Sequence, residues 1–470
     1  MSLPATAGDE APAGEGGLFS RPYRASTIGF ACVMLLEGFA ALALVTIMPV
    51  AVGELHGLRV YTLALGGFVT TSLFGSVLGG ELADRRGPRW PLLVGLALFL
   101  VGLVIAGTAG SVWQLVAGRC IQGFASSIVV VALNVTVGHV YPSRLRPAAL
   151  SLMSTCWIVP SMVGPAIAGA VTELLGWRWV FIGLAILVVV SAAAPVRLLG
   201  RLAPVPVEAP RSPTGRVGAA GVVAVGAGLL QYAASGWDLV HLAFAAAGIA
   251  ALVPSVTRLF PEGTLRAARG LPTMVLLRGI SSGIYFTLES FVPLLLINQR
   301  HVSVTLAGIS FTGATLSWAF AAWLQGHPWS AVPRHRLVFT GSAVIVGSAL
   351  IATVSVIGTV PPLLASVALI VAGFGMGLVL PSLTVLTLDH SRPEDQGRYS
   401  AALQAAQGLG SVVVIGAAGA LFNAGTRLGL PGNTVYGAVF AAVVVISIPA
   451  CLLALRTRVV GHADTTAPAG

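Results

Sequence analysis

Glu37, Arg119 and Glu289 are charged residues that lie inside long apolar stretches. A charge at the centre of a membrane helix costs at least ~2.5 kcal/mol, so such a group is expected to face the protein interior and to serve a function. A carboxyl that is alternately dry and hydrated, or alternately paired and free, can load and release a proton near neutral pH. These residue types therefore favour proton handling inside a membrane.

The two acids are not equivalent. We favour Glu37 as the main proton-coupling acid, with Arg119 on a neighbouring helix as its modulator. Glu37 could instead only order a cationic substrate. Glu289 could be a substrate anchor, a second proton site or a partner of Arg278, although eleven residues, or three helical turns, are too many for direct contact along one helix.

Composition identifies the solvent as lipid. The chain is 56% hydrophobic and 9% charged, whereas a soluble domain carries roughly 25% charged residues. The net charge of +10 comes from arginines in short loops between apolar runs, which argues against a nucleic-acid partner. With no Lys there is no phosphate-binding loop of the Walker type. No nucleophile or metal-ligand cluster is evident, so we expect no catalytic residue, no metal, no cofactor and no enzyme activity.

A helix needs ~20 apolar residues to cross a bilayer, and fourteen stretches meet this criterion. The predicted all-α polytopic fold has helices at about 27–52, 62–82, 91–110, 112–137, 147–172, 179–198, 217–236, 239–257, 272–297, 304–325, 337–357, 362–387, 399–421 and 434–455.

The loop arginines predict the orientation. Twenty lie in loops on one side, and only four, Arg59, Arg178, Arg300 and Arg427, on the other. The arginine-rich side is therefore expected to be cytoplasmic, with both termini inside. The predicted parts are a disordered tail (1–25), two six-helix halves (26–199 and 258–458), a linker (200–216), two extra helices (217–257) and a second tail (459–470).

Two short motifs stand in the first half. G-E-L-A-D-R-R-G-P-R at 80–89 places Gly80 for close helix approach, Asp84 to cap a helix N-terminus, and Arg85 and Arg89 to pair with acids, with Gly87 between them. R-C-I-Q-G-F-A begins at Arg119.

A third motif, G-P-A-I-A-G, occupies 164–169. Gly164 and Pro165 predict a kink, and Gly169 predicts a thin packing face, with Pro160 one turn earlier.

Together these motifs resemble those of the major facilitator superfamily. The 80–89 run is similar to its signature loop, which acts as an inner gate, and 164–169 is similar to its antiporter motif. Fourteen spans resemble its fourteen-helix drug:proton antiporter branch. That branch carries an Asp nine residues before the helix 1 proline; here Ala40 stands nine residues before Pro49, and Glu37 lies one turn away.

The resemblance implies a cell-membrane transporter, in a bacterial inner or plasma membrane, that exchanges protons for small molecules and works as a monomer. Its expected activity is export of hydrophobic or cationic drugs, a route to antibiotic resistance. Export of one endogenous metabolite or lipid, and a non-transporting scaffold or receptor, are the alternatives. The candidate cavity residues are Asn134, Trp157, Tyr285, Phe286, Trp318, Gln404 and Gln407.

Overall fold

The computed structural model describes residues 17–142, 144–199, 215–325, 332–392 and 395–458. Most of the predicted linker and of the two predicted tails lies outside these ranges. The α-helices found within them are α1 (Arg24–Glu54), α2 (Tyr61–Arg86), α3 (Arg89–Gly107), α4 (Val112–Val140), α5 (Arg146–Leu175), α6 (Trp177–Leu199), α7 (Gly215–Ala233), α8 (Leu239–Leu259), α9 (Leu271–Leu294), α10 (Val304–Gln325), α11 (Arg334–Val354), α12 (Leu363–Asp389), α13 (Gln396–Arg427) and α14 (Gly432–Ala454).

Each predicted span coincides with one of these helices, because in lipid the backbone must satisfy its own hydrogen bonds. Among the described residues, ten helices are long and apolar enough to cross a membrane. The parts Val159–Leu175 of α5 and Trp177–Ser191 of α6 meet at 120° and qualify only as a pair, which gives up to eleven. The apolar parts of α7 and α8, Ala220–Ala233 and Leu239–Pro254, are shorter. The count of fourteen spans is therefore not confirmed.

The helix contacts repeat along the chain. In the first half (α1–α6), α4 packs on α2 and α3, while α1 packs on α5 and α6. In the second half (α9–α14), α12 packs on α10 and α11, while α9 packs on α13 and α14. The contacts between the halves repeat in the same way, α5 with α10 and α13 with α2. Each helix of the first half thus corresponds to the helix eight places later in the second half, α1 to α9 and so on to α6 and α14.

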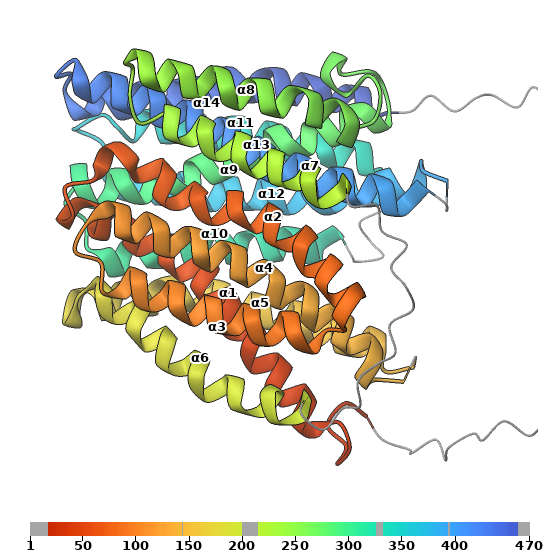
Figure 1. The fold of residues 1–470 in the computed structure, drawn as a ribbon. Helices are drawn as coiled ribbons and strands as arrows, with labels where there is room; N and C mark the ends of the chain where they lie inside the picture. Colours follow the sequence, from red (N-terminus) through yellow and green to blue (C-terminus); the bar gives the residue numbers. More distant parts are fainter. Residues whose placement is uncertain (1–16, 143, 200–214, 326–331, 393–394, 459–470) are drawn as a thin grey trace, which may run out of the picture.

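The pair α7 and α8 lies against the seam between the halves, with α7 on α2 and on α13 (Figure 1). Gln231 of α7 is fully buried and accepts a hydrogen bond from Thr70 of α2 at 3.2 Å. Asp238 lies just before α8, and the side chain and backbone amide of His241, in the first turn of α8, hydrogen-bond to its carboxyl and lower the pKa of that group.

The exterior is apolar on helices that face away from the bundle. Val190 of α6 is 68% exposed, Leu239 of α8 is 84% exposed and Val445 of α14 is 68% exposed. One buried apolar cluster continues through both halves and includes Leu44 of α1 in the first half and Leu288 of α9 in the second. Large exposed apolar surface around a continuous core is the distribution expected of a protein dissolved in lipid.

Candidate functional site

Glu37 lies in a closed, largely apolar environment. Its side chain is 1% exposed, neither carboxyl oxygen makes a hydrogen bond of full geometry, and the hydroxyl of Ser126 on α4 is a polar neighbour. Leu96 and Phe99 of α3 and Val188 and Ser191 of α6 line the small space beside it. An unpaired carboxylate in such surroundings would cost several kcal/mol. The site therefore favours a neutral, protonated carboxyl.

Arg119 does not meet Glu37. It is 1% exposed on α4, and its Nη1 donates to Oε1 of Gln122 at 2.9 Å. Gln122 in turn donates to the carbonyl of Gly102 on α3 at 3.0 Å, and the guanidinium lies over the ring of Phe68 on α2, 4.6 Å from its centre. Arg119 thus ties α4 to its neighbours, and its predicted role as the modulator of Glu37 has no contact to support it in this conformer.

Glu289 lies among aromatic side chains. It is 6% exposed on α9, and the Tyr285 hydroxyl one turn earlier is a hydrogen-bonding neighbour. The Tyr285 ring packs edge-on against Phe286 at 5.4 Å and against Trp318 of α10 at 5.1 Å. The structure therefore brings three of the predicted cavity residues together beside the second buried acid.

Arg278 is the centre of a polar network that sequence reasoning did not find. From α9 it donates to the side-chain oxygens of Gln404 and Gln407 on α13, to the hydroxyl of Thr384 and to the carbonyl of Leu380 on α12. Its side chain is 8% exposed. A lone Arg in an apolar span was the available signal, but its partners lie more than a hundred residues away and leave no local pattern.

Four hydrogen bonds join the two halves at one end of the bundle. Tyr61 at the start of α2 donates to the carbonyl of Ser290 at 2.6 Å. Glu173, in the last turn of α5, accepts from the backbone amide of Thr305 at 2.9 Å and from its hydroxyl at 2.8 Å. We call this end, which carries the α1–α2, α5–α6, α9–α10 and α13–α14 connections, the closed end.

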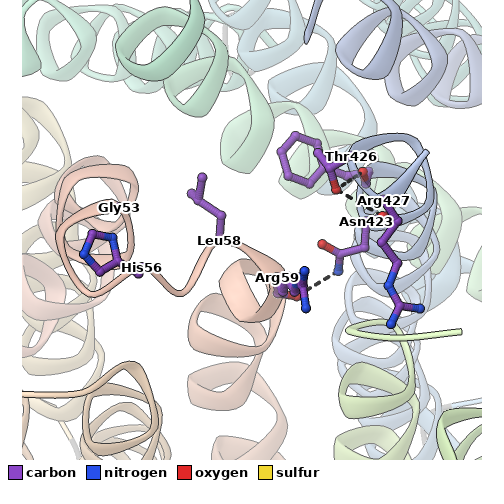
Figure 2. Close-up of a pocket in the computed structure, with 8 residues that line it drawn as sticks. Gly53, His56, Leu58, Arg59, Asn423, Thr426 and Arg427 are labelled. Atoms are coloured by element: carbon purple, nitrogen blue, oxygen red, sulfur yellow. Dashed lines mark hydrogen bonds between the residues drawn. The ribbon is translucent and has the colours of Figure 1, made fainter. Parts of the chain in front are cut away.

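Asn423 of α13 adds a third connection at the closed end. Its side-chain nitrogen donates to the carbonyl of Arg59, at 2.8 Å, and to that of Ala234 after α7, at 2.9 Å. Figure 2 shows Asn423 across from Leu58 and Arg59 at the edge of a cavity of about 310 Å³. One amide therefore joins the first half, the second half and the end of α7.

The glycine face of α5 packs on α10 in the other half. A Cβ on Gly169 would lie 2.7 Å from Cα of Thr305, and a Cβ on Gly308 would collide with the carbonyl of Pro165. Gly164 faces Ala43 and Phe39 of α1 instead. The antiporter-like motif, Pro160 included, thus lies within α5, and Gly169 packs closely against Thr305 of the opposite half.

The 80–89 motif forms the end of α2, a sharp turn and the start of α3. Gly87 adopts a φ of +74°, a left-handed value that favours glycine. Arg85 pairs with Glu81 on its own helix at 2.5 Å, and Arg89 begins α3. The packing role predicted for Gly80 is wrong in this conformer, because nothing lies within 4 Å of a Cβ built there.

Other predicted site residues are less informative. The side chains of Asp84 and Trp157 lie outside the described residues. Asn134 of α4 is exposed and makes no hydrogen bond in the described part of the chain. Gln404 is exposed and Gln407 half-buried, and both join Arg278. Sequence reasoning missed the closed-end residues Glu173 and Asn423.

Paired helical halves around buried charges are the architecture of a multi-pass membrane transporter rather than an enzyme. The family model of the Major Facilitator Superfamily matches residues 30–415. The chain therefore belongs to the Major Facilitator Superfamily.

Its curated relatives include drug transporters. The multidrug transporter protein MdtP of Bacillus subtilis (strain 168) is 25% identical over 394 residues, which cover 81% of this chain and 71% of that one. The probable multidrug-efflux transporter Rv1634 of Mycobacterium tuberculosis (strain ATCC 25618 / H37Rv) is 26% identical over 401 residues, covering 81% and 83%.

Solved structures share the fold. The crystal structure of the peptide transporter POT in complex with sulfate has a TM-score of 0.66 and 16% identity, covering 94% of this chain and 96% of that one. A POT family transporter in complex with 5-aminolevulinic acid has a TM-score of 0.68 and 13% identity, covering 92% and 96%. At these identities the likeness concerns the fold alone.

Proposed function

We propose that this protein is a proton-coupled antiporter that exports hydrophobic or cationic small molecules from the cell. The observation that carries the proposal is Glu37, a carboxyl that is 1% exposed in α1 and has no ion-pair partner in the described part of the chain. The names of the bacterial relatives, multidrug and multidrug-efflux transporters, support the substrate class.

Proton exchange at Glu37 follows from its surroundings. In the conformer described here, the apolar walls keep the carboxyl neutral. When the halves move and water or Arg119 reaches it, the charged form becomes accessible and the proton leaves. A substrate that favours one conformer over the other then exchanges for the proton. Glu289, with Tyr285 beside it, is the second candidate for this role.

The closed end supports a rocking mechanism around a central site. Hydrogen bonds join the halves at one end in the described part of the chain, so the conformer is tied there. We assign the closed end to the outer face, because its connections carry the four arginines of the arginine-poor side. The 80–89 motif then acts as an inner gate on the cytoplasmic face, where both termini lie.

The proposed organisation is that of the fourteen-helix drug:proton antiporter branch. The halves 26–199 and 258–458 carry the transport path, 217–257 is an added pair of helices, and 200–216 is a cytoplasmic linker. Helix α7 packs against α2 of the first half and α13 of the second half. These contacts support an added pair of helices that lies alongside both halves. The proposed functional unit is a monomer in the bacterial inner or plasma membrane.

The test is transport by purified protein in proteoliposomes under an imposed pH gradient, with a panel of dyes and antibiotics. Uptake of several chemically unrelated cationic compounds that stops when an ionophore collapses the gradient is the expected result. Transport that persists without the gradient would remove proton coupling from the proposal. Transport of a single compound from the panel would favour a dedicated metabolite exporter.

A further inference from the structure

The geometry around Arg278 fixes the orientation of two amides. Arginine only donates, so the atoms of Gln404 and Gln407 that face it are their oxygens. Oε1 of Gln407 accepts from Nε at 3.1 Å and from Nη2 at 2.8 Å, and Oε1 of Gln404 accepts from Nη2 at 3.2 Å. The two amide nitrogens therefore point away from the guanidinium. Neither of them donates a hydrogen bond within the described ranges.

The charge of Arg278 has no counter-ion in the described part of the chain. No carboxylate pairs with it, and its remaining donors reach the carbonyl of Leu380 and the hydroxyl of Thr384, at 3.1 and 2.9 Å. All five N–H groups are thus in use, so the guanidinium cannot contact a ligand itself. What the cluster of Arg278, Gln404 and Gln407 presents is a pair of free amide donors backed by a positive charge. Such an arrangement suits an anionic oxygen.

Gln404 faces the other half rather than lipid. Gly408, four residues later and on the same face of α13, would place a Cβ 2.8 Å from Leu73 of α2 in the first half. Gln404 lies one turn further from the closed end than Gly408, and its side chain is exposed there. Its amide is therefore available between the halves, towards the end opposite the closed end.

We propose that the amide donors of Gln404 and Gln407, held by Arg278, bind an anionic oxygen group of the transported substrate at the entrance opposite the closed end. The inference rests on the proposed function and narrows its substrate class. The preferred substrates are amphipathic molecules that carry a carboxylate or an equivalent group in addition to their apolar or cationic body. Arg278 is a positioning residue in this site, and the amides of Gln404 and Gln407 make the contact.

Rhodamine B and its ethyl ester test this directly, because they share one cationic ring system and differ in a free carboxylate. Their binding to the detergent-solubilised full-length protein is measured by fluorescence polarisation. Loss of a hydrogen bond to a charged group weakens binding about tenfold or more. The wild type should therefore bind the acid about tenfold more tightly than the ester.

Two variants at the exposed Gln404 test whether its amide binds the carboxylate of the dye. Gln404→Leu removes the donors and should bring the ratio of the two affinities close to one. Gln404→Glu places a carboxylate against Arg278, and should weaken binding of the acid about tenfold while leaving the ester nearly unchanged. Gln396→Leu, at the start of the same helix, is the matched control and should keep the wild-type ratio. Arg278→Lys should also lower the ratio, because one ammonium group cannot hold both amide oxygens.

Equal affinity of the wild type for both dyes, binding of neither dye, or an unchanged ratio in Gln404→Leu overturns the inference. Transport in proteoliposomes separates it from the proposed function. Proton-driven transport without a preference for the acid would support the proposed antiporter and contradict the anion site. A preference for the acid in binding, without proton-driven transport, would support the anion site and contradict the proposed antiporter.

Discussion

Glu173 at the end of α5 accepts two hydrogen bonds from Thr305 at the start of α10, one from its backbone amide and one from its hydroxyl. A carboxylate at a helix N-terminus satisfies an amide that the helix leaves unpaired and interacts favourably with the helix dipole. Because the two helices belong to different halves, this cap exists only while the closed end is closed. Its free energy therefore contributes to the balance between conformers rather than to the fold of either half.

Glu173→Gln should shift that balance towards opening. Removal of a charged cap costs about 1 kcal/mol, which corresponds to a change of about fivefold in the equilibrium between the conformers. The measurement is the labelling rate of a cysteine placed at Ser290, which is buried beneath Tyr61, by a membrane-impermeant maleimide. The rate should rise several-fold.

Glu54→Gln is the matched control for that experiment. Glu54 accepts from Trp177 at 2.8 Å and from Arg178 at 3.2 Å, all within the first half. Its loss should leave the labelling rate at Ser290 unchanged. If both variants raise the rate equally, the effect is general loosening, and the cap on α10 has no special part in closure.

Glu37→Gln should abolish proton-driven transport and keep the binding of neutral substrates, because the amide copies the shape of the protonated carboxyl. Cationic substrates should bind more weakly if the same acid attracts them. The deciding measurement is proton release from detergent-solubilised protein when substrate is added. Normal release by the variant would move the coupling site elsewhere, and Glu289→Gln would then be the next variant to measure.

Gly308→Ala should destabilise the protein and the closed conformer together. The added methyl would collide with the carbonyl of Pro165 across the α5–α10 contact, and overpacking of this kind costs about 1–3 kcal/mol. The apparent unfolding temperature in detergent should fall. Gly183→Ala on α6, where nothing lies within 4 Å of a Cβ, should leave it unchanged. A similar fall for both substitutions would show that the loss of stability does not come from the α5–α10 contact.

Asp84→Asn should slow the transport cycle more than it weakens substrate binding, because the gate motif at the end of α2 lies away from Glu289 and its aromatic neighbours. Turnover in proteoliposomes and dye affinity in detergent are measured on the same preparation. Asp389→Asn, at the end of α12, is the control for loss of one negative charge. A fall in affinity at full turnover would reassign Asp84 to the substrate path.

The topology can be measured on intact cells after the native cysteines are replaced. A cysteine at Ser212, in the predicted linker, should react only after the membrane is permeabilised. A cysteine at Asn433, in the first turn of α14, should react from outside. Labelling of both from the same side would contradict the arginine-based orientation and the count of fourteen spans on which it depends.

Sequence alone determined where the helices lie. Lipid leaves the backbone no alternative to internal hydrogen bonds, so each long apolar run had to be helical, and each predicted span coincides with a helix of the structure. The charges of Glu37, Arg119 and Glu289 within those runs were equally visible, as were the motifs of the Major Facilitator Superfamily. Each of these signals is local, and none depends on how one helix is rotated against another.

Tertiary structure alone decided which side chains meet. Arg119 contacts Gln122 and Phe68 instead of Glu37, and Arg278 finds Gln404 and Gln407, 126 and 129 residues away. Such pairs depend on how whole helices pack and rotate against one another. Small residues at the helix interfaces determine this packing, because they allow the backbones to approach closely. A single sequence contains the charges, but the fold chooses their partners.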